Sequence, residues 1–200
     1  MNIGIIKNTI CIAAAVFDDL KTAKDFLTAN VWPGADAVAE LPGGYGIGDD
    51  YDGEKWRKPE VDIDALRSAR LAEISAAANA AITSGCEVDL PSGSTEQFSL
   101  TEADQINLSA AFTAVAQGAP GYPYHADGQL CRLYPAADIA AIGAAVTAHK
   151  MYHTTYCNHM LVWTRRAETP EELAAIHYGT ELPKDLAKNM MEVLQFAQGN

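Results

Sequence analysis

The stretch PEVDIDALRSARLAEISAAANAAITSG, residues 59–85, decides the fold class of this chain because the composition changes there. The residues before it are rich in glycine, aspartate and short alternating apolar runs, whereas those after Asp62 are rich in alanine. Asp62 is a good N-cap, and Gly85 supplies the left-handed position at which many helices end. We predict a helix between them, with an apolar stripe made of Leu71, Ile74, Ala78 and Ile82. A domain boundary is expected at Pro59 to Val61.

The residues before this boundary, 1–59, predict a small β-rich module. Isoleucines alternate with other residues on both sides of Lys7-Asn8-Thr9, which is the pattern of a β-hairpin. Asp19 can cap a short helix that ends near Asn30. The segment Gly43–Gly53 is dense in turn-forming residues, and a last short strand surrounds Trp56.

Residues 62–200 predict a helical domain that carries short β-hairpins. Two hairpins are expected, at Cys86–Leu100 and at Tyr122–Tyr134. Further helices are expected to begin at Thr101, Ala136 and Thr169. The Thr101 helix carries the apolar residues Ile106, Leu108, Phe112 and Val115. The helices that begin at Asp62, Thr101 and Ala136 are expected to pack on one another, which gives an α+β fold.

The charge of the chain argues against two classes of partner. The formal net charge is -12, so nucleic acid and anionic membrane surfaces are repelled, and a basic protein surface is attracted. Hydrophobic residues make up 48% of the chain, which is enough to bury a core. The interpretation is a soluble protein that binds another protein.

The cysteines and the N-terminal residues predict a cytosolic location. Cys11, Cys86, Cys131 and Cys157 are far apart and form no CxxC pair, so we expect free thiols in a reducing compartment. The apolar run Ile10–Phe17 is short for a signal peptide. A secreted or surface protein is the alternative that this run leaves open.

One cluster resembles a metal site. His149, His153 and Cys157 recur every four residues and therefore share one face of the predicted long helix, where they could hold zinc. The general-base glutamate of the HExxH pattern is absent because Thr154 follows His153, and a fourth ligand must come from elsewhere. Packing explains the same pattern. A zinc-dependent hydrolase built on these residues is therefore kept as the alternative function, and we expect no metal.

No other segment predicts an enzyme or a cofactor site. The glycines of Gly43–Gly53 resemble a phosphate cradle, but no Lys-Ser/Thr pair follows them and the neighbouring aspartates repel phosphate. The nucleophile motif Gly-x-Ser-x-Gly is absent from the sequence. The expectation is a protein without catalytic residues, metal or cofactor.

Aromatic residues in predicted loops are the candidate partner-binding residues. Tyr45 and Tyr51 lie in the acidic turn segment, and Tyr122 and Tyr124 flank Pro123 in another expected loop. Tyrosines offer a large contact area at low entropic cost, so these four are the candidates for protein recognition. Trp56 is expected instead to fill the core of the small module.

Two stretches resemble proteins of bacteriophage tails. Gly44–Trp56, with its Gly-Ile-Gly-Asp turn and aromatic strand, resembles a segment of N-terminal modules in phage tail and tail-fibre proteins. Leu66 to about Trp163 resembles an uncharacterised phage domain family by the order of its elements, among them the Ser99–Asn107 helix start and a His-Ala-Asp-Gly hairpin.

The resemblance implies a tail accessory protein of a phage or prophage. Such a protein is either a tail-fibre assembly factor or a minor tail or baseplate component, and its partner is a tail-fibre or baseplate protein. It implies a location in the host cytoplasm during assembly. Whether the protein is retained in the virion tail, and whether it forms a homo-oligomer, are left open. It supplies no catalytic residues, and residues 164–200 fall outside it.

Overall fold

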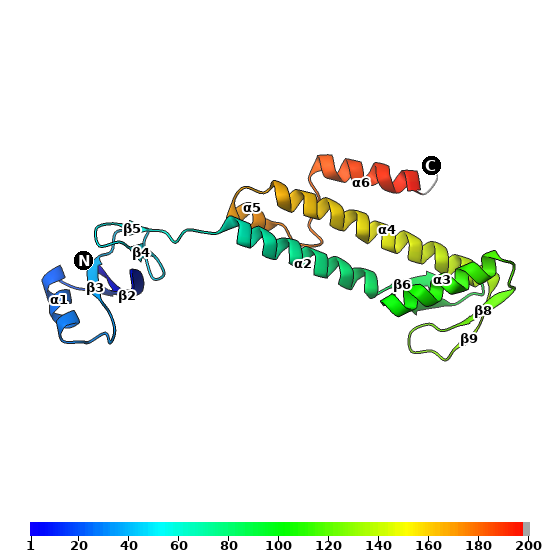
Figure 1. The fold of residues 1–200 in the computed structure, drawn as a ribbon, viewed down its shortest axis with the longest axis horizontal. Coiled ribbons are helices and arrows are strands. Elements are labelled where there is room, and N and C mark those ends of the chain that lie inside the picture. The colour runs from blue at the N-terminus through cyan, green and yellow to red at the C-terminus, as the bar shows by residue number, and fades with distance from the viewer. Residues whose placement is uncertain (198–200) are drawn as a thin grey trace. The chain divides into compact units, whose positions relative to one another are not determined.

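The computed structural model describes residues 1–197 and has an α+β fold. The chain forms two compact units, Met1–Val61 and Asp62–Asn200, each of which is described by itself (Figure 1). Among the described residues, no helix is long and apolar enough to cross a membrane.

The first unit is an antiparallel sheet with one helix. Its strands run in the order β3-β1-β2-β4-β5. Their bounds are β1 (Asn2–Lys7), β2 (Ile10–Val16), β3 (Ala37–Glu40), β4 (Asp50–Tyr51) and β5 (Trp56–Arg57). The helix α1 (Leu20–Thr28) is capped by the Asp19 side chain, as the sequence predicts. The predicted hairpin is β1 and β2, which turn at Asn8 and Thr9 with positive φ angles.

Two buried clusters hold this sheet together. Ile3, Ile5 and Val38 pack with Ala23 of α1. Successive residues of a strand face opposite sides of a sheet, so Gly4 lies on the other side from Ile3 and Ile5. There it lies under Trp56, because a Cβ at this position would be 2.5 Å from the indole ring. Trp56 is buried and donates from Nε1 to Glu40 O at 2.6 Å, which confirms its predicted role as a core residue.

The second unit consists of helices with two two-stranded hairpins. Its helices are α2 (Ile63–Thr83), α3 (Glu102–Ala116), α4 (Ala136–Arg166), α5 (Pro170–Ala175) and α6 (Lys184–Ala197). The hairpins are β6 (Cys86–Asp89) with β7 (Thr95–Phe98), and β8 (Gly121–Tyr124) with β9 (Arg132–Pro135). Asp62 caps α2, and Thr101 and Thr169 form complete capping boxes with Asp104 and Glu172.

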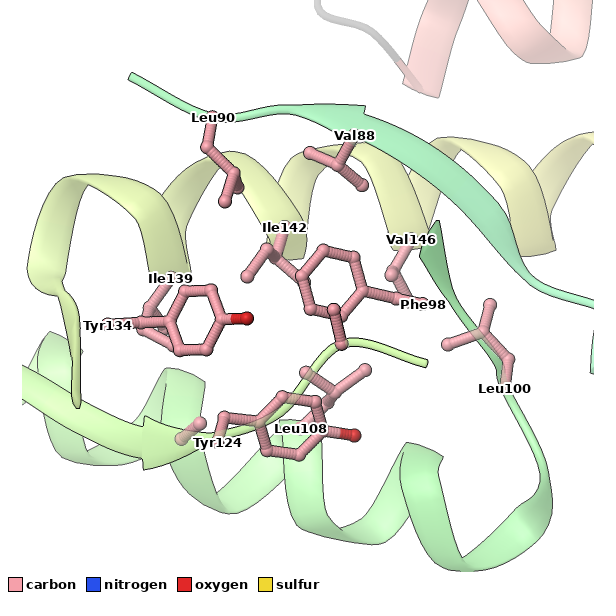
Figure 2. Close-up of a cluster of buried hydrophobic side chains, with 12 residues drawn as sticks. Val88, Leu90, Phe98, Leu100, Leu108, Tyr124, Tyr134, Ile139, Ile142 and Val146 are labelled. Carbon is pink, nitrogen blue, oxygen red and sulfur yellow. The ribbon is translucent and has the colours of Figure 1, made fainter. Parts of the chain in front are cut away.

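The first half of α4 packs into a core built with both hairpins and α3. Figure 2 shows Phe98 of β7 between side chains of α4 and of the hairpins. The buried residues of this cluster are Val88, Leu90, Phe98, Leu100, Leu108, Ala111, Tyr124, Ala126, Tyr134, Ile139, Ile142 and Val146. Both hairpins and α3 therefore bury apolar side chains against α4.

The second half of α4 packs into a different core. Tyr156 and Met160 of α4 lie with Ile74 of α2, Leu173 of α5 and Met190 of α6. The helices α2 and α3 thus each pack on α4, along different stretches of it (Figure 1). Ile106, one of the apolar residues that the sequence places on this α3 helix, is 71% exposed. It precedes the buried Leu108 by two residues, which is about half a helical turn away.

Candidate functional site

The glycine-rich segment of the first unit, Gly43–Gly53, is stabilised by one buried carboxylate. Asp49 is 5% exposed. Its Oδ2 accepts the Gly46 N–H at 2.7 Å and forms an ion pair with Lys58 Nζ at 2.7 Å. The hydrogen bond from Lys58, together with that from Gly46, lowers the pKa of Asp49 below its ordinary value. The segment also pairs with β2, since Cys11 N–H donates to Asp49 O and Gly48 N–H donates to Cys11 O.

This ordered segment keeps apolar groups at the surface. Ile47, between Gly46 and Gly48, is 70% exposed. Tyr45 and Tyr51 are half-buried against Trp56, with ring centroids 6.3 Å and 4.9 Å from the indole. Lys58 Nζ lies 5.3 Å from the Tyr45 ring, within the range of a cation–π contact. The structure therefore brings the two predicted tyrosines of this unit onto one aromatic cluster.

The other two predicted tyrosines do not form an exposed recognition surface. Tyr124 is 6% exposed and packs in the core beside Phe98, and burial raises its pKa to about 12. Tyr122 is half-buried against the same core. The expected exposure is wrong here because residues 121–124 form β8, the first strand of the predicted hairpin, in which positions 122 and 124 share one face that lies against the core. Pro123 takes the outward face.

The histidine and cysteine residues on α4 are engaged in packing. His149 Nε2 donates to Ala81 O of α2 at 3.0 Å, and His153 Nδ1 is bonded to the Tyr178 hydroxyl at 2.8 Å. Burial raises the pKa of the Cys157 thiol, which disfavours the thiolate that zinc requires. Within residues 1–197, no group of three or more His, Cys, Asp or Glu side chains is arranged to hold a metal ion.

A pocket of about 410 Å³ lies on the same part of α4. Three segments form its wall: α4, the connection between α5 and α6, and α6 itself. The lining residues are Tyr152, His153, Tyr156, Tyr178, Gly179, Thr180, Glu181, Leu182, Ala187, Met190, Met191 and Leu194. Aromatic rings dominate the α4 side, and the α6 side is aliphatic.

Hydrogen bonds fix the aromatic rings of this pocket. The Tyr156 hydroxyl donates to Thr180 O and accepts the Gly179 N–H. Burial is the main cause that lowers the pKa of His153, and the nearby His149 lowers it further. Burial also raises the pKa of Tyr178 to about 12. At neutral pH the His153–Tyr178 pair is therefore uncharged.

Sequence reasoning did not find this pocket. The one sequence feature that indicates it is the pair Tyr152 and Tyr156, which are four residues apart and therefore neighbours on the surface of α4. Tyr178 comes from a connection that carries no motif, so its place against α4 depends on the long-range packing of α6.

Residues 65–177 match a domain of unknown function, DUF4376. The chain belongs to the DUF4376 family. The DUF4376 segment includes most of α2, both hairpins, α3, α4 and α5, and it overlaps the stretch Leu66 to Trp163. The α4 wall of the pocket lies inside the DUF4376 segment, whereas Tyr178 and α6 follow it. No curated protein and no solved structure matches the chain.

Proposed function

We propose that this DUF4376 protein is an accessory protein of a bacteriophage or prophage tail that acts by binding another tail protein. It serves as a tail-fibre assembly factor or as a minor tail or baseplate component. The observation that carries the proposal is the glycine-rich segment of the first unit, which leaves Ile47 exposed and Tyr45 and Tyr51 half-buried.

The geometry of this segment suits protein recognition. Because the contacts of the buried Asp49 hold the turn in one conformation, the turn loses little conformational entropy when a partner binds to it. Half-exposed tyrosines on a rigid base provide contact area at low entropic cost. The resemblance of Gly44–Trp56 to phage tail modules concerns this same segment, and it supports a tail-fibre or baseplate protein as the partner.

Charge supports a partner with a basic surface. The exposed Glu54 follows the turn, while Asp52 forms an ion pair with Arg57 at 2.6 Å. With a formal net charge of -12, the chain attracts a basic protein over distances comparable to the Debye length.

Co-purification with the tail-fibre and baseplate proteins of the same phage or prophage tests the proposal. Ile47→Asp places a charge at the exposed tip and should abolish or strongly weaken capture without unfolding the unit. Val31→Asp is the matched control, since Val31 is also an exposed aliphatic residue of a loop in this unit. Equal capture by the wild type and Ile47→Asp would reject this surface, and capture of none of the tail proteins would reject the function.

Purified virions separate the two roles within the proposal. An assembly factor is expected to be absent from mature particles, whereas a minor tail component is expected at a fixed ratio to the fibre. Quantitative mass spectrometry of gradient-purified virions measures this ratio.

A further inference from the structure

Three tyrosine rings, those of Tyr152, Tyr156 and Tyr178, line the pocket of the second unit. Tyr152 and Tyr156 are stacked, with ring centroids 6.1 Å apart and planes at 10°. Tyr178 meets Tyr156 edge to face at 5.1 Å. Two differently oriented sets of tyrosine rings therefore line one cavity. The face of an aromatic ring carries partial negative charge and attracts cations.

The hydroxyl groups of Tyr156 and Tyr178 are hydrogen-bonded within the protein. The Tyr156 hydroxyl has partners in Thr180 and Gly179, and the Tyr178 hydroxyl is bonded to His153. These hydroxyls are consequently not free to serve as the main polar contacts of a ligand. The aromatic rings can instead attract a cation through their π electrons.

The fixed charge at the pocket is negative. Of the lining residues in the described chain, Glu181 alone carries a formal charge at neutral pH, and it is exposed to solvent. No lysine or arginine is among these lining residues to compete for it. A cation that enters gains both the ring faces and a carboxylate, and the acidic chain as a whole favours its approach.

We propose that this pocket binds an alkylammonium group, with the cation held against Tyr152 and Tyr178 and balanced by Glu181. Two sources present this chemistry, a free quaternary amine and the lysine side chain of a protein. The aliphatic wall from α6, which includes Met190 and Leu194, accommodates the alkyl part of either one. The site is separate from the glycine-rich segment of the first unit and does not rest on the proposed tail function.

Calorimetric titration of the full chain tests the role of the charge. Choline is compared with 3,3-dimethylbutan-1-ol, which has nearly the same shape and no charge, and with Nα-acetyl-lysine methylamide. We expect at least one cation to bind about tenfold or more tightly than the neutral alcohol. Tighter binding of choline assigns the site to a quaternary amine, and tighter binding of the lysine analogue assigns it to a protein side chain. If neither cation binds at millimolar concentration, or if the alcohol binds equally well, the proposal is wrong.

Variants then place the binding in this pocket. Tyr152→Leu should weaken cation binding about tenfold, whereas Tyr152→Phe keeps the ring and should keep the affinity. Glu181→Gln should weaken binding severalfold, and Glu192→Gln, on the exposed surface of α6 and outside the pocket lining, should not. Because Tyr152 and Glu181 are both exposed, these variants should fold. Unchanged binding in both Tyr152→Leu and Glu181→Gln would overturn the proposal.

Discussion

Burial in the second unit lowers the pKa of His153 from its ordinary value of 6.5, and His149 lowers it further. The half-buried ring contacts the rings of Tyr152 and His149 edge to face and is hydrogen-bonded to the hydroxyl of Tyr178. It is therefore neutral in the folded chain under conditions in which the unfolded chain already binds a proton. This difference links folding to pH, because the unfolded state takes up the proton more readily.

The first prediction follows from this linkage. The stabilising effect of the neutral His153 is fully present above pH 6.5 and is lost as the pH falls below 6.5 toward the lower pKa of the folded chain. His153→Gln should therefore show a smaller loss of unfolding free energy between pH 7 and pH 5 than the wild type does. Urea unfolding at several pH values measures the slopes. A ring-proton NMR titration that gave His153 a pKa at or above 6.5 would contradict the prediction.

The second prediction concerns Gly85, which ends α2 with a φ of +72°. A Cβ at this position would be 1.7 Å from Phe98 O, so an alanine strains the backbone and also displaces β7. Gly85→Ala should lower the free energy of unfolding by about 3 kcal/mol or more. Gly128→Ala is the matched control: Gly128 has a φ of +70° and open space around it, so the cost should be about 1 kcal/mol. Equal costs in urea unfolding would show that the contact with Phe98 is unimportant.

At the scale of elements, local sequence patterns such as helix caps and hairpin turns predict the elements correctly. Asp19, Asp62, Thr101 and Thr169 each cap a helix, because an N-cap needs only a side chain and the next few backbone N–H groups. The hairpins follow from alternation and turn residues in the same way. Elements whose ends are marked within a few residues can be found without knowledge of the rest of the fold.

Predictions that depended on which face of an element is buried were less reliable. Tyr122 and Tyr124 are expected to be exposed on either side of Pro123, yet in the hairpin of β8 with β9 Tyr124 faces the core. Tyr178 likewise lies at the pocket through long-range contacts. The Tyr156 hydroxyl, 22 residues earlier in the sequence, is hydrogen-bonded to Gly179 and Thr180, and α6 packs in the same cluster. Long-range pairing decides both outcomes, and a single sequence holds little information about it.

The helix α4 has different neighbours along its length, and this leads to the third prediction. Ile142 is fully buried in the core of Figure 2, so Ile142→Ala should lower the free energy of unfolding by about 2 to 5 kcal/mol. The exposed Ile106 on α3 is the matched control, and Ile106→Ala should change it by less than about 0.5 kcal/mol. Chemical denaturation compares the two. Similar losses for both would mean that Ile106 is covered in solution.

At the scale of the whole molecule, the change of composition near Pro59 coincides with a division of the buried residues. The clusters around Ile3 and Trp56 consist of residues from Met1–Val61, whereas those on α4 consist of residues from Asp62 onward. A unit that buries its own apolar side chains has the main driving force for folding within itself. The DUF4376 segment lies wholly within the second of these units.

The last prediction is that a fragment of residues 62–200 folds cooperatively without the first unit. Its two cores share α4, so the loss of either one removes packing from the same helix, and the fragment should unfold in a single transition. The amide NMR resonances of the fragment should overlay those of the same residues in the full chain, except near Asp62. A longer fragment that begins at Lys55 serves as a control for the cut, because it keeps the residues that precede the cap of α2. If the 62–200 fragment lacks dispersed resonances while the full chain shows them, the second unit depends on the first for its stability, and the division of the chain into two folding units is wrong.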